Sequence, residues 1–336
     1  MSHRPPDHPP IPSPRVGVLL VNLGTPDAAE AGAVRRYLAE FLSDRRVVEI
    51  PRVAWLPILH GMILRTRPAK SAHAYRQVWS EAGSPLAAIT AAQARALRDA
   101  FGPDVIVDHA MRYGNPAIGD RLADLKARGC ERILVAPLYP QYCAATTATA
   151  NDAAYAALAT MRWQPALRTL PPYHDDPAYI AALAASIERE VAALPFVPDA
   201  IMASFHGMPQ RTLTLGDPYH CHCRKTARLL SDALGRELVV CFQSRFGRAK
   251  WLEPATDATL AELPARGIHK LAIVAPGFSA DCVETLEELA IRGRETFLAA
   301  GGEEFACLPC LNASDEGVAM LRTILSRELE GWTSRT

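Results

Sequence analysis

A histidine at the end of an apolar run is the first candidate for chemistry in this chain. His206 ends "MASFH" and is followed at once by the turn residues Gly207 and Pro209, so a buried strand should reach the surface at this imidazole. An imidazole titrates near neutrality and can act as a base or a metal ligand. A structural role, with the ring bonded to a nearby carbonyl, fits the same pattern. From His206 alone, both roles stay open.

The second candidate is the acidic segment "SADCVETLEEL", residues 279–289. We expect a helix that begins at Ser279 or Asp281. On such a helix Asp281, Glu284 and Glu288 stand at i, i+3 and i+7, on one face. The helix dipole favours carboxylates near an N-terminus, which is the structural interpretation. The functional interpretation is a path for divalent cations or protons, because carboxylate oxygens bind both.

The elements that position these residues are apolar runs separated by segments of helical period. Six runs are expected to be buried strands: residues 16–24, 105–114, 132–140, 200–207, 238–247 and 271–279. Continuous apolar strands that alternate with helices indicate parallel sheets in an α/β fold.

An internal repeat divides the chain. "VNLGTP" (21–26) matches "SFHGMP" (204–209), residues 107–114 match 240–247, and residues 127–137 match 265–276, in the same order. We therefore expect two similar Rossmann-like, doubly wound halves that face a central cleft, residues 15–175 and 176–313. A disordered Pro-rich segment over 1–14 and a C-terminal helix over 314–332 complete the expected organisation. The repeat pairs His206 with Leu23.

Composition restricts the function classes. The chain has 336 residues, enough for two domains, and its 36 Lys and Arg balance 36 Asp and Glu. Nucleic-acid binding, which needs a basic excess, is therefore not expected. No run of about 18 apolar residues predicts a membrane span. Without an export signal we expect a cytoplasmic protein, whose eight cysteines stay free of disulfides.

Several motifs together resemble the ferrochelatase family, whose members insert ferrous iron into a porphyrin in the last step of haem synthesis. The resemblance runs from Val16 to Asn312. It rests on "VNLGTPD", "GSPL", "MRYGNP", "YPQY", "SFHGMPQR", "GDPY", "FQSRFGRAKWLEP" and "ADCVETLEEL". It implies two Rossmann-like halves around a porphyrin cleft, in agreement with the repeat.

The resemblance also implies roles for individual residues. His206 matches the active-site histidine and Glu284 the acid that faces it, so these two are the expected catalytic residues. The expected metal contacts are His206, Glu284, Asp281 and Glu288. The expected porphyrin contacts are Arg112, Tyr113, Tyr139, Tyr142, Arg65, Arg67 and Ser204. Some relatives carry histidine where this chain has Cys282, so a role of that histidine in iron delivery does not transfer.

The apolar segment 52–70 ends in the basic residues Arg65, Arg67 and Lys70. It fits an ordinary buried helix with a basic terminus. It also fits a lip over the porphyrin, with basic residues for the propionates and contact with the inner face of a membrane. The resemblance favours the lip.

Four cysteines raise the question of a cofactor. Cys221 and Cys223 form C-x-C after "GDPY", and Cys307 and Cys310 form C-x-x-C. Four thiols could hold a [2Fe–2S] cluster, as in some members of the family, although this chain has no cysteine-rich C-terminal extension. In an extended C-x-x-C the two thiols point to opposite faces, so Cys307 is the weakest candidate. Reduced cysteines without a cluster are the alternative.

Protoporphyrin IX is the expected substrate, with Fe²⁺ as the second substrate. Coproporphyrin III, another tetrapyrrole or metal, and a carrier that binds porphyrin without catalysis remain as alternatives. No obligate protein partner is expected.

Overall fold

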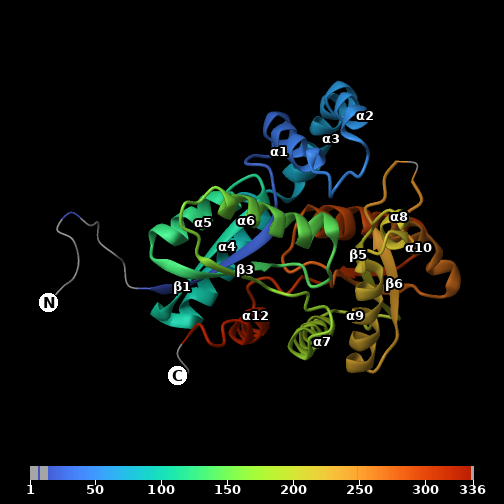
Figure 1. Cartoon of the computed structure of the whole chain (residues 1–336). Helices are drawn as coiled ribbons and strands as arrows, with labels where there is room; N and C mark the ends of the chain where they lie inside the picture. Colours follow the sequence, from blue (N-terminus) through green and yellow to red (C-terminus); the bar gives the residue numbers. More distant parts are fainter. Residues whose placement is uncertain (1–6, 8–13, 248, 334–336) are drawn as a thin grey trace.

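Two four-stranded parallel sheets form the centre of the molecule (Figure 1). The computed structural model describes Asp7 and residues 14–247 and 249–333, so most of the expected disordered segment 1–14 lies outside it. The strand orders are β2-β1-β3-β4 and β6-β5-β7-β8. The two sheets have the same strand order when β1, β2, β3 and β4 are matched to β5, β6, β7 and β8. The predicted α/β fold with two similar halves is thus confirmed.

The first half contains the first sheet and the helices around it. Its strands are β1 Arg15–Gly24, β2 Val105–Tyr113, β3 Cys130–Pro137 and β4 Ala166–Thr169. Its α-helices are α1 Ala31–Ser43, α2 Arg52–Ile58, α3 Leu64–Val78, α4 Pro85–Phe101, α5 Ile118–Ala127 and α6 Thr149–Ala159. Two π-helices, η1 Leu59–Ile63 and η3 Ala144–Ala148, and the 3₁₀ turn η2 Gly102–Asp104 lie among them.

The second half follows α7, Pro177–Ala192. Its strands are β5 Ala200–His206, β6 Leu238–Gln243, β7 Lys270–Val274 and β8 Glu304–Cys307. Its α-helices are α8 Gln210–Thr214, α9 Tyr219–Leu234, α10 Thr256–Glu262, α11 Arg294–Ala299 and the terminal α12 Asp315–Glu328. The 3₁₀ turn η4, Pro264–Arg266, and the π-helix η5, Glu284–Gly293, complete it.

All six predicted strands are present. The strands β4 and β8 were not predicted, because each has four residues and only partly buried side chains, too little for an apolar run. Both lie at sheet edges, beside β3 and β7.

The terminal helix α12 starts where its sequence predicts a cap. The Ser314 hydroxyl accepts a hydrogen bond from the backbone N–H of Gly317. Met320, Leu321 and Leu325 bury the inner face of α12 in one hydrophobic core that also holds residues of both sheets. The two halves are therefore packed together through a common core. None of the described helices is long and apolar enough to cross a bilayer.

The repeat holds for the topology but not for every matched residue. Arg112 lies within β2, whereas its partner in the repeat, Arg245, follows the end of β6 and pairs with Asp257 at the surface. The strand β6 stops because Ser244 takes a left-handed conformation, with φ of 63°. The second half therefore has no counterpart of Arg112 inside its sheet.

Candidate functional site

His206 is the last residue of β5, and its side chain is partly exposed there. The ring atom Nδ1 lies 2.7 Å from the carbonyl oxygen of Gly207. Because a carbonyl only accepts hydrogen bonds, this contact assigns the ring proton of a neutral His206 to Nδ1 and the lone pair to Nε2. The carbonyl of His206 accepts a bond from the Tyr219 hydroxyl at 2.9 Å. The imidazole is thus oriented with Nε2 available to a proton or a metal ion.

Gln243 connects His206 to the segment that carries Glu284. It stands opposite His206 in the β5–β6 ladder, and its carbonyl accepts a bond from the Gly207 N–H at 2.7 Å. Its side-chain amide donates to the carbonyl of Glu284 at 2.9 Å and accepts from the Ser204 hydroxyl at 2.8 Å. Gln243 therefore joins the backbone next to His206 to the backbone of Glu284. Its only signal in the sequence was a lone amide at the end of an apolar run.

Glu284 is the first residue of η5, which is a π-helix. The predicted helix that carries the acids is present, but its type and its start differ: the π-helix begins at Glu284 rather than directly after Ser279 or Asp281, and its bonds run from i to i+5. π-Helical segments are rare in proteins, and those that occur are often found at functional sites. Burial, together with the nearby Glu284 carboxylate, raises the pKa of Tyr75 in α3 well above its usual value. Glu284 is therefore close to Tyr75 of α3.

Two further carboxylates of the acidic segment have protein partners. Asp281 is buried and accepts bonds from the Thr285 hydroxyl at 2.8 Å and the Asn312 amide at 2.7 Å. Glu288 accepts bonds from the N–H and hydroxyl of Ser244 at 2.8 and 2.5 Å. Because Asp281 precedes η5, the three acids do not form the expected row on one helix face. In the described part of the chain, no group of three or more His, Cys, Asp or Glu side chains is placed to hold a metal ion.

Cys282 lies between these acids and is buried. Burial, and then the negative charge of Glu284, raises the pKa of its thiol well above the usual value. The thiol stays protonated at neutral pH.

Arg112 and Tyr113 are fixed by two residues that no motif had indicated, Asp44 and Thr149. The guanidinium of Arg112 donates to the Asp44 carboxylate at 2.6 Å and to the Thr149 carbonyl at 2.9 Å. The Tyr113 hydroxyl donates to the same carboxylate at 2.9 Å. Burial alone would raise the pKa of Asp44, but hydrogen bonds from Thr149, the Arg46 N–H and Tyr113 and the charge of Arg112 lower it. Asp44 is thus the ionised centre of a polar network.

The other expected porphyrin contacts differ in their environment. The Tyr139 hydroxyl is buried without a hydrogen-bond partner among the described residues, and burial raises the pKa of this phenol well above its usual value. Tyr142 is partly exposed, and its N–H donates to Nδ1 of His222 at 3.2 Å. Ser204 is fully buried, and its hydroxyl is bonded to Gln243 and to Thr256 at 2.8 Å. Ser204 therefore reaches the site through Gln243.

The segment 52–70, called the lip below, forms α2, η1 and the start of α3 (Figure 1). Its interpretation as an ordinary buried helix is wrong for α2, which has no buried residue. Large apolar side chains exposed on or next to the lip are Ile50, Val53, Ile58 and Met62. Arg65 is exposed, and Arg67 is partly buried.

The four candidate cluster ligands do not form one site. Cys221 and Cys223 lie on α9, where Cys221 is exposed and Cys223 is buried, because residues two apart point to different sides of a helix. The Cys307 thiol lies 3.8 Å from the carbonyl of Thr285, and Cys310 is buried beside Asp281. These four thiols therefore do not fit a [2Fe–2S] cluster.

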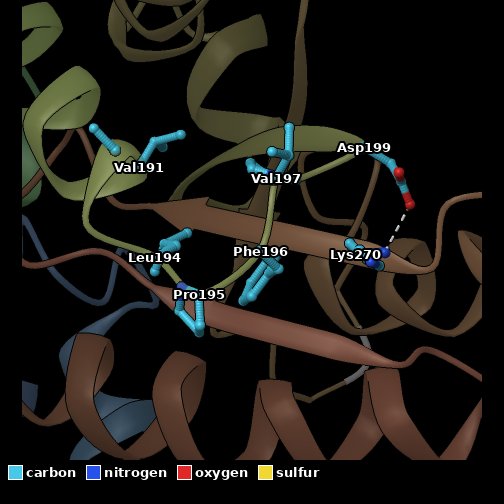
Figure 2. A pocket seen from close by; sticks show the side chains of 9 residues that line it. Val191, Leu194, Pro195, Phe196, Val197, Asp199 and Lys270 are labelled. Carbon is cyan, nitrogen blue, oxygen red and sulfur yellow. Dashed lines mark hydrogen bonds between the residues drawn. The ribbon is translucent and has the colours of Figure 1, made fainter.

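A hollow of about 700 Å³ lies elsewhere (Figure 2). It is lined by residues 191, 192 and 194–199 and by Lys270, at the amino-terminal ends of β5 and β7. His206 is at the opposite end of β5, so this hollow is separate from the candidate site.

The sequence profile of the ferrochelatase family matches residues 15–329. The chain belongs to the ferrochelatase family. It is 55% identical to the ferrochelatase of Rhizobium meliloti strain 1021 over 97% of this chain and 98% of the relative. It is 54% identical to the ferrochelatase of Methylibium petroleiphilum over 96% of this chain and 90% of that one. The chain is accordingly a lyase of haem biosynthesis that acts on a porphyrin, with ferrous iron as substrate.

Solved structures of low sequence identity share the fold. SirB from Bacillus subtilis, determined with Fe³⁺, superimposes with a TM-score of 0.57 at 13% identity, over 95% of this chain and 97% of its own. CbiX, described as the terminal enzyme of sirohaem biosynthesis in denitrifying bacteria, gives a TM-score of 0.50 at 16% identity, over 94% of this chain and 100% of its own. At these identities the likeness concerns the fold alone.

Proposed function

We propose that this ferrochelatase inserts Fe²⁺ into protoporphyrin IX at the ends of β5 and η5, with His206 and Glu284 as catalytic residues. Metallation forms bonds from iron to the ring nitrogens and releases two pyrrole protons. The observation that carries the proposal is the orientation of His206, whose Nδ1–H is directed to the Gly207 carbonyl while Nε2 keeps its lone pair. Nε2 can accept one pyrrole proton or hold the entering ion.

Glu284 is proposed as the partner of His206. Gln243 ties the backbone of Glu284 to the strand that ends in His206, which supports a fixed relation between the two side chains. A carboxylate can take the second proton or complete the metal contact, and imidazole with carboxylate suits Fe²⁺. Two protein ligands are enough for an ion that leaves with the product. Asp281 and Glu288 are proposed to attract iron toward Glu284 through their charge.

The porphyrin is proposed to lie between this pair and the first half. Arg112 and Tyr113, fixed through Asp44, would form part of its wall, with Tyr139 and Tyr142. Arg65 and Arg67 of the lip are proposed to bind the propionates, since a guanidinium matches a carboxylate in charge and geometry. Ser204 supports the site indirectly through Gln243. A rigid wall that favours a bent macrocycle would lower the barrier to metallation.

The first test uses His206→Ala and Glu284→Gln, with iron insertion followed by absorbance and porphyrin binding by fluorescence. We expect His206→Ala to abolish turnover and to retain binding, and Glu284→Gln to be severely impaired. Glu288→Gln is the matched carboxylate control and should be milder if this residue only attracts ions. Near-normal turnover of His206→Ala would refute the assignment, and a porphyrin carrier would show binding without turnover in the unchanged protein.

The second test concerns the porphyrin. Protoporphyrin IX and coproporphyrin III differ by two propionates, so steady-state metallation of both separates the proposed substrate from its alternative. We expect a higher kcat/KM for protoporphyrin IX. A preference for coproporphyrin III would identify that porphyrin as the substrate. The proposed roles of His206 and Glu284 would not change.

We also propose that the lip touches a membrane surface from the cytoplasmic side. Val53 and Met62 are 88% and 56% exposed, and basic side chains follow them along the lip. Apolar side chains next to basic ones favour anionic bilayers. Flotation with vesicles of anionic lipid tests this: Val53→Asp with Met62→Gln should reduce binding, and equal binding would contradict the proposal.

A further inference from the structure

One contact between the lip and the second half is made by a cation and an aromatic ring. The guanidinium carbon of Arg67 lies 5.0 Å from the centre of the Phe246 ring. The Phe246 ring in turn contacts the Trp251 ring, with 5.0 Å between the two centres. Arg67 belongs to α3, whereas Phe246 lies after the end of β6, in residues 244–247 and 249–252, here called the Phe246 loop. In Figure 1 this loop rises toward α2 and α3.

The Phe246 loop is attached directly to the turn that follows His206. The Leu252 N–H donates to the carbonyl of Met208 at 2.9 Å, and the Gln210 N–H donates to the carbonyl of Lys250 at 2.8 Å. The Trp251 indole donates to the carbonyl of Phe246 at 2.9 Å, which closes the loop on itself. The Phe246 loop is therefore anchored to the residues that follow His206.

We propose that Arg67 and Phe246 form a latch that holds the lip against the second half and so slows the release of bound porphyrin. The latch itself follows from the contacts, whereas its effect on porphyrin rests on the function proposed above. Phe246 is 54% exposed, so the contact is open to solvent and has the modest strength of an exposed cation–π pair. Arg67 is partly buried, and burial lowers the pKa of its guanidinium, which stays charged at neutral pH.

Hydrogen exchange of the lip amides in the protein without substrate tests the latch. Phe246→Ala and Arg67→Met should each raise exchange of residues 52–70 about 2- to 5-fold, the range of an exposed cation–π contact. Phe246→Tyr, which keeps an aromatic face, should match the unchanged protein. Arg65→Met is the matched control, because Arg65 is an exposed arginine of the same helix. The double variant Arg67→Met with Phe246→Ala should exchange no faster than either single variant.

Unchanged lip exchange in Phe246→Ala, equal effects of Arg65→Met and Arg67→Met, or additive effects in the double variant would overturn the latch. Release of pre-bound protoporphyrin IX, followed by fluorescence after dilution, then tests the gating role. We expect about 2- to 5-fold faster release from Phe246→Ala and normal release from Phe246→Tyr. A looser lip with unchanged release would overturn the gating role alone. Absence of porphyrin binding by the unchanged protein would instead refute the proposed function.

Discussion

Removing the carboxylate of Asp44 should release Arg112 and Tyr113 from the wall proposed for the porphyrin. The Asp44 and Arg112 side chains are 12% and 18% exposed, and the carboxylate accepts bonds from Arg112, Tyr113 and Thr149. Breaking a fully buried pair by removing one partner costs about 3–5 kcal/mol. Because this pair keeps some contact with water, we expect Asp44→Ala to lower the free energy of unfolding by about 2–4 kcal/mol.

Urea unfolding at pH 7.5 measures this change, with Asp152→Ala as the matched control. Asp152 pairs with Arg46 nearby, but their side chains are 51% and 41% exposed, so its loss should cost less than about 1 kcal/mol. Activity provides a second readout, because a mobile Arg112 should raise KM for porphyrin more than it lowers kcat. A loss below about 1 kcal/mol in Asp44→Ala, or equal losses in both variants, would refute the reasoning.

The contribution of Asp44 to the free energy of unfolding should also depend on pH, in a direction set by the pKa of its carboxyl. The folded protein lowers the pKa of Asp44 from its ordinary value of 3.8. The ionised carboxylate therefore contributes its full stability above pH 3.8, and this contribution is lost as the pH falls through the lower pKa of the folded state. The difference in unfolding free energy between the unchanged protein and Asp44→Asn should be constant from neutral pH down to about pH 5 and shrink at more acidic pH.

Two other predictions follow from the packing. Gly207→Ala should impair folding or turnover, since a Cβ there would lie 2.4 Å from the Gln243 carbonyl oxygen; Gly61→Ala, with no atom within 4 Å, is the control for thermal unfolding and activity. Equal behaviour of the two variants would contradict the close approach. Tyr139→Phe should raise the free energy of unfolding by about 1 kcal/mol, because it removes a buried hydroxyl without a partner among the described residues. Destabilisation by a similar amount would show that the hydroxyl is bonded.

Only some residues of the candidate site could be predicted from the sequence. His206 stood out because a strand end with a histidine is a local pattern, and Glu284 because acids cluster beside it. Asp44, Thr149 and Gln243 did not, since their roles depend on contacts with residues distant in the chain. Asp44, for example, is 68 residues from Arg112 and 105 from Thr149.

In the acidic segment, residue spacing did not predict the type of helix or the partners of the carboxylates. The spacing of Asp281, Glu284 and Glu288 fits one face of an α-helix, but Asp281 precedes the segment and the other two acids lie in a π-helix. The partners of Asp281 and Glu288 could not be found from this spacing either. Asp281 is held by Asn312 and Glu288 by Ser244, and both partners come from other strands or loops.

The sequence by itself determined the six long apolar strands, the two similar halves and the position of His206, because apolar runs bounded by Gly and Pro specify buried parallel strands locally. Only the tertiary structure decided the tautomer of His206, the bridge through Gln243 and the contact of Arg67 with Phe246. The tautomer depends on how the backbone turns at Gly207. The other two join segments that approach each other only after the halves pack, and such pairs leave no spacing in the sequence.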